Sequence, residues 1–95
     1  MYARVARWEG VDAETMEAMT KQIQEADGPP EGVPSNGILV LNDKDAGRSL
    51  VVGLFETEDD LRKGDETLNS MNPDMPGSGK RASVEMYEVG VERRI

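Results

Sequence analysis

The sequence predicts a single α+β domain over residues 1–95, with elements in the order β-α-β-β-α-β. Three observations support this prediction. Two apolar runs flank a short polar turn between Gly37 and Glu56, which is typical of a β-hairpin. Side chains alternate over Tyr2–Trp8 and again over Ala82–Val91, which predicts two further strands. Two stretches of helical periodicity lie between them. This order is the ferredoxin-like plan, a four-stranded antiparallel sheet with two helices on one face.

The first helix is expected to begin after Asp12, because a carboxylate at this position can accept hydrogen bonds from the free amides of the first turn. Val11, just before it, can pack onto Met16 and fix the entry of the chain. The apolar stripe of this helix has helical spacing and consists of Met16, Met19 and Ile23.

The central hairpin carries apolar side chains on both faces of its strands. In the first strand of the hairpin Leu39 and Leu41 point one way and Ile38 and Val40 the other. In the second strand Val51 and Phe55 oppose Leu50, Val52 and Leu54. Strands that are apolar on both faces must be covered on both faces. Helices of the same chain can cover one of them, so we expect a second copy of the chain, and therefore a homodimer, to cover the other. The turn is expected over Asn42–Gly47, with Gly47 at positive φ.

The second helix is expected to start at Thr57, whose hydroxyl and the acid at Asp60 form a variant of the capping box. Its apolar stripe is predicted to consist of Leu61, Leu68 and Met71. Gly64 lies on the same face, although glycine inside a helix costs about 1 kcal/mol relative to alanine. We therefore expect a close approach of this helix to the sheet, or to a ligand lying on the sheet.

The composition excludes several classes of function. The chain has no cysteine and no histidine, so thiolate sites, cysteine nucleophiles and histidine bases or ligands are impossible. A net charge of -8 argues against binding nucleic acids or anionic membranes. The apolar runs are strand-sized, well below the roughly 20 residues needed to cross a bilayer, and the first residues lack the apolar core of a signal peptide. We expect a cytoplasmic protein.

Three short motifs resemble ligand sites and fail on context. The G-x-G-x-x-A match at Gly77–Ala82 follows a helix and leads into a strand, whereas a dinucleotide site needs the reverse order. The Asp43-x-Asp45-x-Gly47 sequence resembles the start of a calcium loop, but its twelfth position is Leu54, inside a strand. The acids of Glu56–Asp60 suit the positive end of a helix dipole. No metal site is predicted.

Four residues are candidates for binding a substrate. Tyr2, Arg4 and Trp8 share one face of the first strand, and an arginine between two aromatic rings can stack with them or hold a phenolate-like group. Alternatively, Trp8 fills the core and Arg4 pairs with an acid. Asn69 lies near the end of the second helix, where its alternative role is capping. The sequence identifies no catalytic residue.

The chain also resembles a known group of proteins. The opening MYARVARWEG, the run GRSLVVGLFETEDDLRKGDETLN and the later SVEMYEV are similar to the antibiotic-biosynthesis-monooxygenase-like group of the dimeric α+β barrel superfamily. The resemblance covers nearly the whole chain. It implies that two subunits pack their sheets face to face and that each keeps a pocket between its sheet and helices. Active members oxidise aromatic polyketides or quinol-like substrates with oxygen and no metal or flavin, while others degrade haem.

The resemblance implies roles for Tyr2, Arg4, Trp8 and Asn69, because such pockets use Asn, Trp, Tyr and Arg to orient the substrate. Haem-degrading members need an axial histidine, which this sequence lacks, and an asparagine on the first strand, where this sequence has Ala6. Haem degradation is therefore not expected.

Two functions remain open. One is a cofactor-independent monooxygenase acting on a small aromatic such as an anthrone or hydroquinone, with Tyr2 and Trp8 flanking the ring and Arg4 stabilising the phenolate. The other is a non-catalytic homodimer that binds a small apolar ligand or serves a partner.

Overall fold

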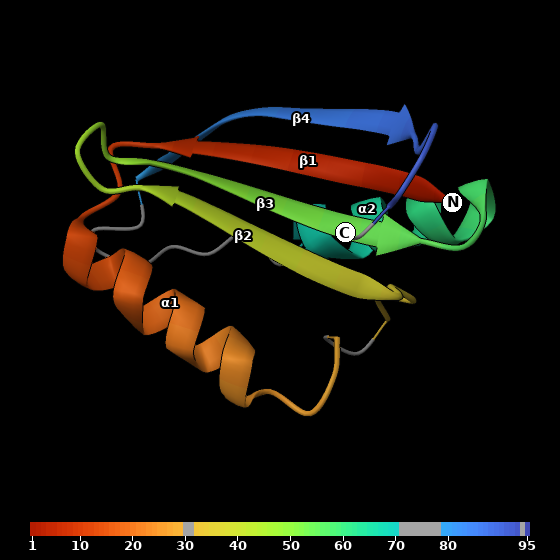
Figure 1. The fold of residues 1–95 in the computed structure, drawn as a ribbon, viewed down its shortest axis with the longest axis horizontal. Helices are drawn as coiled ribbons and strands as arrows, with labels where there is room; N and C mark the ends of the chain where they lie inside the picture. The colour runs from red at the N-terminus through yellow and green to blue at the C-terminus, as the bar shows by residue number, and fades with distance from the viewer. Residues whose placement is uncertain (30–31, 71–78, 94) are drawn as a thin grey trace.

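The structure, a computed structural model, describes residues 1–29, 32–70, 79–93 and 95, and it confirms the predicted order of elements (Figure 1). The elements are β1 (Tyr2–Glu9), α1 (Ala13–Glu25), β2 (Gly37–Asp43), β3 (Arg48–Phe55), α2 (Glu58–Ser70) and β4 (Lys80–Glu88). Of the predicted features, Met71 and the glycine-rich match at 77–78 lie outside the described residues.

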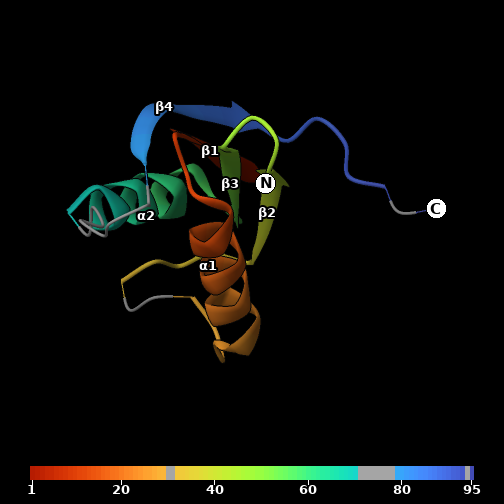
Figure 2. The same cartoon turned by 90° about the vertical axis from the view of Figure 1, so that its left-hand side faces the viewer.

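The four strands form one antiparallel sheet in the order β2-β3-β1-β4. β1 lies in the centre and pairs along its length with β3, from Tyr2 opposite Phe55 to Glu9 opposite Arg48. Both helices lie on the same face of the sheet. α2 lies behind β1 and β3 in Figure 1, and α1 packs against β2 and β3 at the lower edge of that view (Figures 1 and 2). We refer to this as the helix face and to the opposite one as the open face.

Helix α2 approaches the sheet closely because it has a glycine where it crosses Phe55. Phe55 is fully buried, and a Cβ atom placed on Gly64 would lie 2.7 Å from Cζ of its ring. The glycine therefore makes room for the sheet, which is the first of the two explanations expected from the sequence. Around this contact is a small core of Val33, Phe55 and Leu61, with Tyr2 and Leu68 packed against it.

The two helices begin differently. Thr57 Oγ1 accepts a hydrogen bond from the amide of Asp60 at 3.1 Å, which confirms the predicted cap of α2. Asp12 is the N-cap residue of α1, as predicted, but its side chain makes no capping hydrogen bond. The start of α1 is held instead by Val11, which is buried and whose amide donates to the carbonyl of Gly47 at 2.9 Å.

The strand ends also differ from the prediction in places that matter for the site. β2 continues to Asp43, so the turn is Lys44–Gly47 and Asn42 belongs to the strand. Gly47 has the expected positive φ, 67°. β4 begins two residues before Ala82 and ends at Glu88 rather than at Val91, and its ladder with β1 ends at the Tyr2–Glu88 pair.

The open face is apolar over β2 and β3 and uncovered in a single chain. Leu39 and Leu41 are each about half exposed, at 49% and 51%. The β4 side of this face is more polar, and there the hydroxyl of Tyr87 donates a hydrogen bond to Glu85, which raises the pKa of Tyr87. None of the helices in the described part of the chain is long and apolar enough to cross a membrane.

The Gly64–Phe55 contact gives a direct test of the packing of α2. Gly64→Ala should lower the free energy of unfolding by about 1–3 kcal/mol, because overpacking against a buried ring outweighs the gain in helix propensity. Lys63→Ala, an exposed neighbour on the same helix, should leave stability within about 0.5 kcal/mol. Urea denaturation of both variants measures the difference, and a stabilised Gly64→Ala protein would contradict this packing.

Candidate functional site

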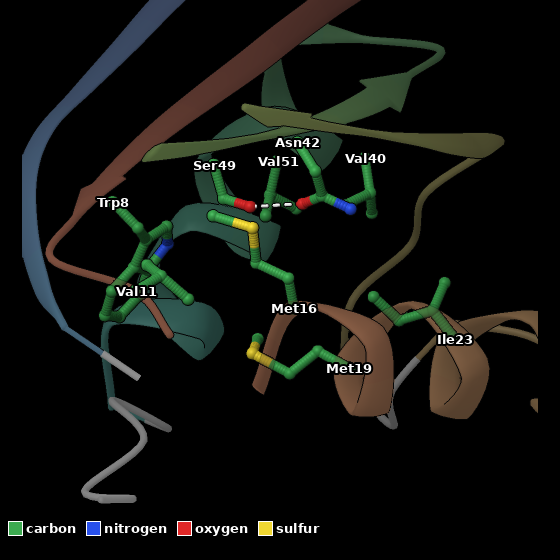
Figure 3. A pocket seen from close by; sticks show the side chains of 9 residues that line it. All are labelled: Trp8, Val11, Met16, Met19, Ile23, Val40, Asn42, Ser49 and Val51. Carbon is green, nitrogen blue, oxygen red and sulfur yellow. Dashed lines mark hydrogen bonds between the residues drawn. The ribbon is translucent and has the colours of Figure 1, made fainter. Parts of the chain in front are cut away.

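The clearest candidate site is a small pocket between α1 and the sheet (Figure 3). Its lining comprises Trp8, Val11, Met16, Met19, Ile23, Val40, Asn42, Ser49 and Val51. The pocket has a volume of about 20 Å³, enough for about one water molecule. It is nearly closed in this conformation, so any larger occupant requires side chains to move.

The pocket is formed where the apolar stripe of α1 meets the hairpin. Met16 points from α1 toward the sheet, Met19 extends sideways below Met16, and Val40 and Val51 point from β2 and β3 toward α1 (Figure 3). Met16 is 1% exposed and fills the space between the two layers. Methionine is unbranched and adapts to irregular space, so these walls are deformable.

A polar pair interrupts the apolar lining at the hairpin end of the pocket. Ser49 and Asn42 are opposite each other on β3 and β2, and the hydroxyl of Ser49 donates to Oδ1 of Asn42. Asn42 Nδ2 donates in turn to Thr20 Oγ1 on α1 at 3.0 Å. Ser49 is only 9% exposed, so its hydroxyl belongs to the interior.

Sequence reasoning missed this pair because it assigned Asn42 to the turn. The alternation of β2 contained the signal. Asn42 comes two residues after Val40 and therefore shares its face, and the same holds for Ser49 and Val51 on β3.

Trp8 forms one wall of the pocket and is the only tryptophan in the chain. The structure therefore places it next to the candidate ligand space, on the α1 side of the helix face. Because a single tryptophan dominates the intrinsic fluorescence of a protein, it also offers a spectroscopic probe of this pocket alone.

Arg4 lies on the same face of β1 but turns toward α2. It is 5% exposed, its Nε donates to Asp65 Oδ1 at 2.8 Å, and its Nη2 donates to Asn69 Oδ1 at 3.1 Å. The structure thus brings two of the predicted residues, Arg4 and Asn69, into direct contact. It also shows that Arg4 pairs with an acid, which was the alternative expected from the sequence.

A second arginine, missed from the sequence, completes this network. Arg81 on β4 donates from Nη1 to Asn69 Oδ1 at 2.7 Å, so that one amide oxygen accepts from two arginines. In the pairing of β1 with β4, Arg7 is opposite Ser83, but the next residue, Trp8, is opposite Arg81. Ala82 is therefore an extra residue, and it forms a bulge in β4. The extra residue reverses the direction of the side chain, as bulges commonly do, and Arg81 faces the helices.

Tyr2 is remote from the pocket. It packs against the Val33–Phe55–Leu61 core beneath α2, six residues along β1 from Trp8. At about 3.3 Å per residue the two aromatic residues are about 20 Å apart along the strand. They do not flank one small ring, and the four predicted residues occupy three places on the helix face.

Comparison with known proteins rests on structure. No protein-family model and no curated protein matches the sequence. Among solved structures, a variant of MhuD with two manganese protoporphyrin IX molecules bound per active site is similar, with a TM-score of 0.67 and 17% identity over 99% of each chain. A protein from Deinococcus radiodurans, provisionally named an antibiotic biosynthesis monooxygenase, has a TM-score of 0.59 and 14% identity, covering 100% of this chain and 98% of the other.

The chain has the antibiotic-biosynthesis-monooxygenase-like fold. Both likenesses extend over the whole chain, in agreement with the resemblance found in the sequence. At these identities they establish the fold alone and leave the activity and the substrate open.

The residues of this chain do not fit a porphyrin. The sequence has no histidine to ligate its metal, and the pocket of about 20 Å³ is far smaller than a macrocycle. Ala6, at the centre of the helix face between Arg4 and Trp8, is 2% exposed and offers no polar group. Among the described residues, no group of three acidic side chains could hold a metal ion either.

The Arg4 network should contribute more to stability than a surface ion pair. Arg4→Ala leaves Asp65 without its cation and removes a buried side chain, so we expect a loss of about 2–4 kcal/mol in the free energy of unfolding. Arg62→Ala, which breaks the exposed pair with Glu58, should cost at most about 0.5 kcal/mol. Urea denaturation compares the two, and equal small losses would refute a structural role for Arg4.

Proposed function

We propose that this protein is a homodimer whose α1 pocket binds a small aromatic molecule of phenol or quinol type. The observation that carries the proposal is the lining of the pocket, which is apolar except for the buried Ser49 hydroxyl and the more exposed Asn42 amide to which it is hydrogen-bonded, beside the indole of Trp8. Ligand sites commonly combine an apolar wall with a few placed polar groups.

The polar pair has the chemistry to orient a phenolic hydroxyl. Because the Ser49 hydroxyl gives its proton to Asn42, its oxygen retains lone pairs that can accept from the O–H of a ligand. The ring of that ligand would then lie among the methionines and against Trp8. Ser49 and Asn42 supply orientation, and neither is a strong base.

Entry of a ring requires the methionines to move, because the present volume admits about one water molecule. Met19 is partly exposed and lies at the outer side of the pocket, whereas Met16 is buried. Rotation of the unbranched Met19 side chain is the smallest change that opens the site.

The homodimer is supported by the open face. Leucine and valine side chains from β2 and β3 lie there without cover in a single chain, and Leu39 and Leu41 remain half exposed. Contiguous apolar surfaces of this kind mark interaction sites. β2 and β3 are apolar on both faces, and strands of this kind are normally covered on both faces. A second copy packed on the open face would supply the missing cover.

Binding can be measured through the fluorescence of Trp8. Titration with 1,4-naphthohydroquinone should quench the emission in a saturable manner. Ser49→Ala should raise the dissociation constant about fivefold, the equivalent of one neutral hydrogen bond of about 1 kcal/mol. Ser70→Ala, the same change on the outer end of α2, should leave the constant unaltered. Linear, non-saturating quenching equal to that of a free indole would show that no site exists.

We further propose a reaction at this site, the oxygenation of the bound aromatic by O₂ without a metal or a flavin. For an anthrone, O₂ would convert the ring CH₂ into C=O and release one H₂O, with all four electrons supplied by the substrate. Such a reaction proceeds through the substrate anion, which a cation beside the pocket can stabilise. Arg81 is the better candidate, because it is opposite Trp8 and its guanidinium donates to the uncharged Asn69, whereas Arg4 is paired with the carboxylate of Asp65.

Oxygen uptake tests this step. Wild-type protein should consume O₂ with an anthrone faster than the uncatalysed autoxidation, and Arg81→Gln should lower the rate about tenfold, corresponding to about 1.4 kcal/mol of lost stabilisation. Arg62→Gln, on the exposed side of α2, should not change the rate.

The same experiments separate the enzyme from its alternative. Saturable quenching of Trp8 without any acceleration of O₂ uptake would favour the second function, a non-catalytic homodimer that binds a small apolar ligand. That outcome would remove the oxygenation step and keep the site.

A further inference from the structure

Asn36 and Gly37, at the start of β2, form a dipeptide that is prone to a covalent change. Asparagine is a labile residue in proteins, because the backbone nitrogen of the following residue can attack the carbonyl carbon of its side-chain amide. Glycine has no Cβ and leaves that nitrogen the least hindered. Asn36 is exposed and lies in a bend just before the ladder, while Gly37 is the first residue of the edge strand β2. Strand ends of this kind open at little cost in free energy, so the two groups can meet.

The side-chain amide of Asn36 is anchored at the protein surface. Its Nδ2 donates to Glu56 Oε2 at 2.8 Å, and both side chains are exposed. Glu56 directly precedes Thr57, the residue that caps α2, so this hydrogen bond ties the start of β2 to the connection between β3 and α2. A hydrogen bond between exposed groups is readily exchanged for bonds to water, so it does not prevent the side chain from reacting.

The fold does not require a glycine at position 37. The φ angle of Gly37 lies outside the left-handed region, unlike that of Gly47. A Cβ atom placed on Gly37 would lie 3.6 Å from Leu54 Cδ1, which is an ordinary contact, whereas a Cβ on Gly64 would collide with a buried ring. An alanine at position 37 should therefore keep the structure while it hinders the attacking nitrogen, and this makes the dipeptide directly testable.

The other two asparagines of the described residues are in less reactive surroundings. Asn42 lies within β2 and is followed by Asp43, and Asn69 lies within α2 and is followed by Ser70. Both side chains belong to hydrogen-bonded networks with neighbouring elements. A regular backbone and a larger following residue hinder the same attack, so among these three asparagines the reaction is expected at Asn36.

We propose that Asn36–Gly37 is a site of spontaneous modification that releases the start of β2 from Glu56. The nitrogen of Gly37 forms a bond to Cγ of Asn36, Nδ2 leaves as ammonia, and a five-membered imide results. Water then opens the imide at either carbonyl and gives aspartate or isoaspartate, so the net change is a hydrolysis with no redox step. Either product loses the Nδ2 donor and adds a negative charge near Glu56, which turns an attraction into a repulsion. This inference is independent of the proposed ligand and of the homodimer.

Mass spectrometry of tryptic peptides tests the modification on the full chain. During incubation in warm, mildly alkaline buffer, the peptide Gln22–Lys44 should gain the mass difference between an NH₂ and an OH group, and fragmentation should place this gain at Asn36. Gly37→Ala should slow the gain about tenfold, because its Cβ hinders the attacking nitrogen. Gly28→Ala, the same change at an exposed glycine of the same peptide with open space around it, should leave the rate unaltered. Circular dichroism verifies that both variants fold.

Two outcomes would overturn the modification site. One is a wild-type protein that keeps its mass over an interval in which a synthetic peptide of the sequence 34–41 is converted, because the fold then protects Asn36. The other is an equal rate in the wild-type and Gly37→Ala proteins, because the nitrogen of residue 37 is then not the attacking group.

The effect on β2 is measured with Asn36→Asp, which reproduces one of the two products. Amide hydrogen exchange over Gly37–Val40 should become about fivefold faster, the equivalent of one lost hydrogen bond at the start of the strand. Ser35→Ala, at the neighbouring residue, should leave this exchange unchanged. Equal exchange in the Asn36→Asp and wild-type proteins would show that the modification does not release β2.

Discussion

The structure depends on one constraint: strands β2 and β3 are apolar on both faces, while the chain has helices for only one face. The helix face buries Phe55 and Met16 completely or nearly so. On the open face Leu39 and Leu41 are half exposed. The exposed part of these side chains stays in contact with water, so its burial does not contribute to folding. A cover from outside the chain would remove this exposed apolar surface from water, and the proposed homodimer would supply it.

The helix face itself is divided between a tight half and an adaptable half. Gly64 lets α2 lie directly on β1 and β3, and Arg4, Asp65 and Asn69 tie this helix to the sheet with directed hydrogen bonds. α1 reaches the sheet through long methionine side chains and leaves a small cavity beneath them. The α2 half is therefore a rigid support, and the α1 half is the deformable wall of the pocket.

The sequence predicted the elements and most of their boundaries because their signals are local. The Thr57 cap and the positive φ of Gly47 follow from the neighbouring residues. The glycine at position 64 itself indicated that α2 approaches the sheet closely. The site was predicted less well because it depends on pairing between distant strands. The bulge that turns Arg81 toward the helices exists only through its register with β1, and the Asn42–Ser49 pair requires the true end of β2. Trp8 and Arg4 share one face of β1, as the alternation predicted, but the side chain of Arg4 is hydrogen-bonded to Asp65 on α2.

Charge would oppose pairing two copies of an acidic chain unless the excess lies away from their contact. A net charge of -8 per chain is substantial. The register of the strands shows that the open face carries three basic and three acidic side chains, namely Arg7, Arg48, Lys80, Glu9, Asp43 and Glu85. The charges of the open face are thus balanced, and the acidic excess lies elsewhere, for example on α1 and α2, which lie on the opposite face of the sheet. Charges separated by more than about 8 Å are largely screened at physiological ionic strength. The acidic excess therefore does not oppose contact between the open faces of two chains.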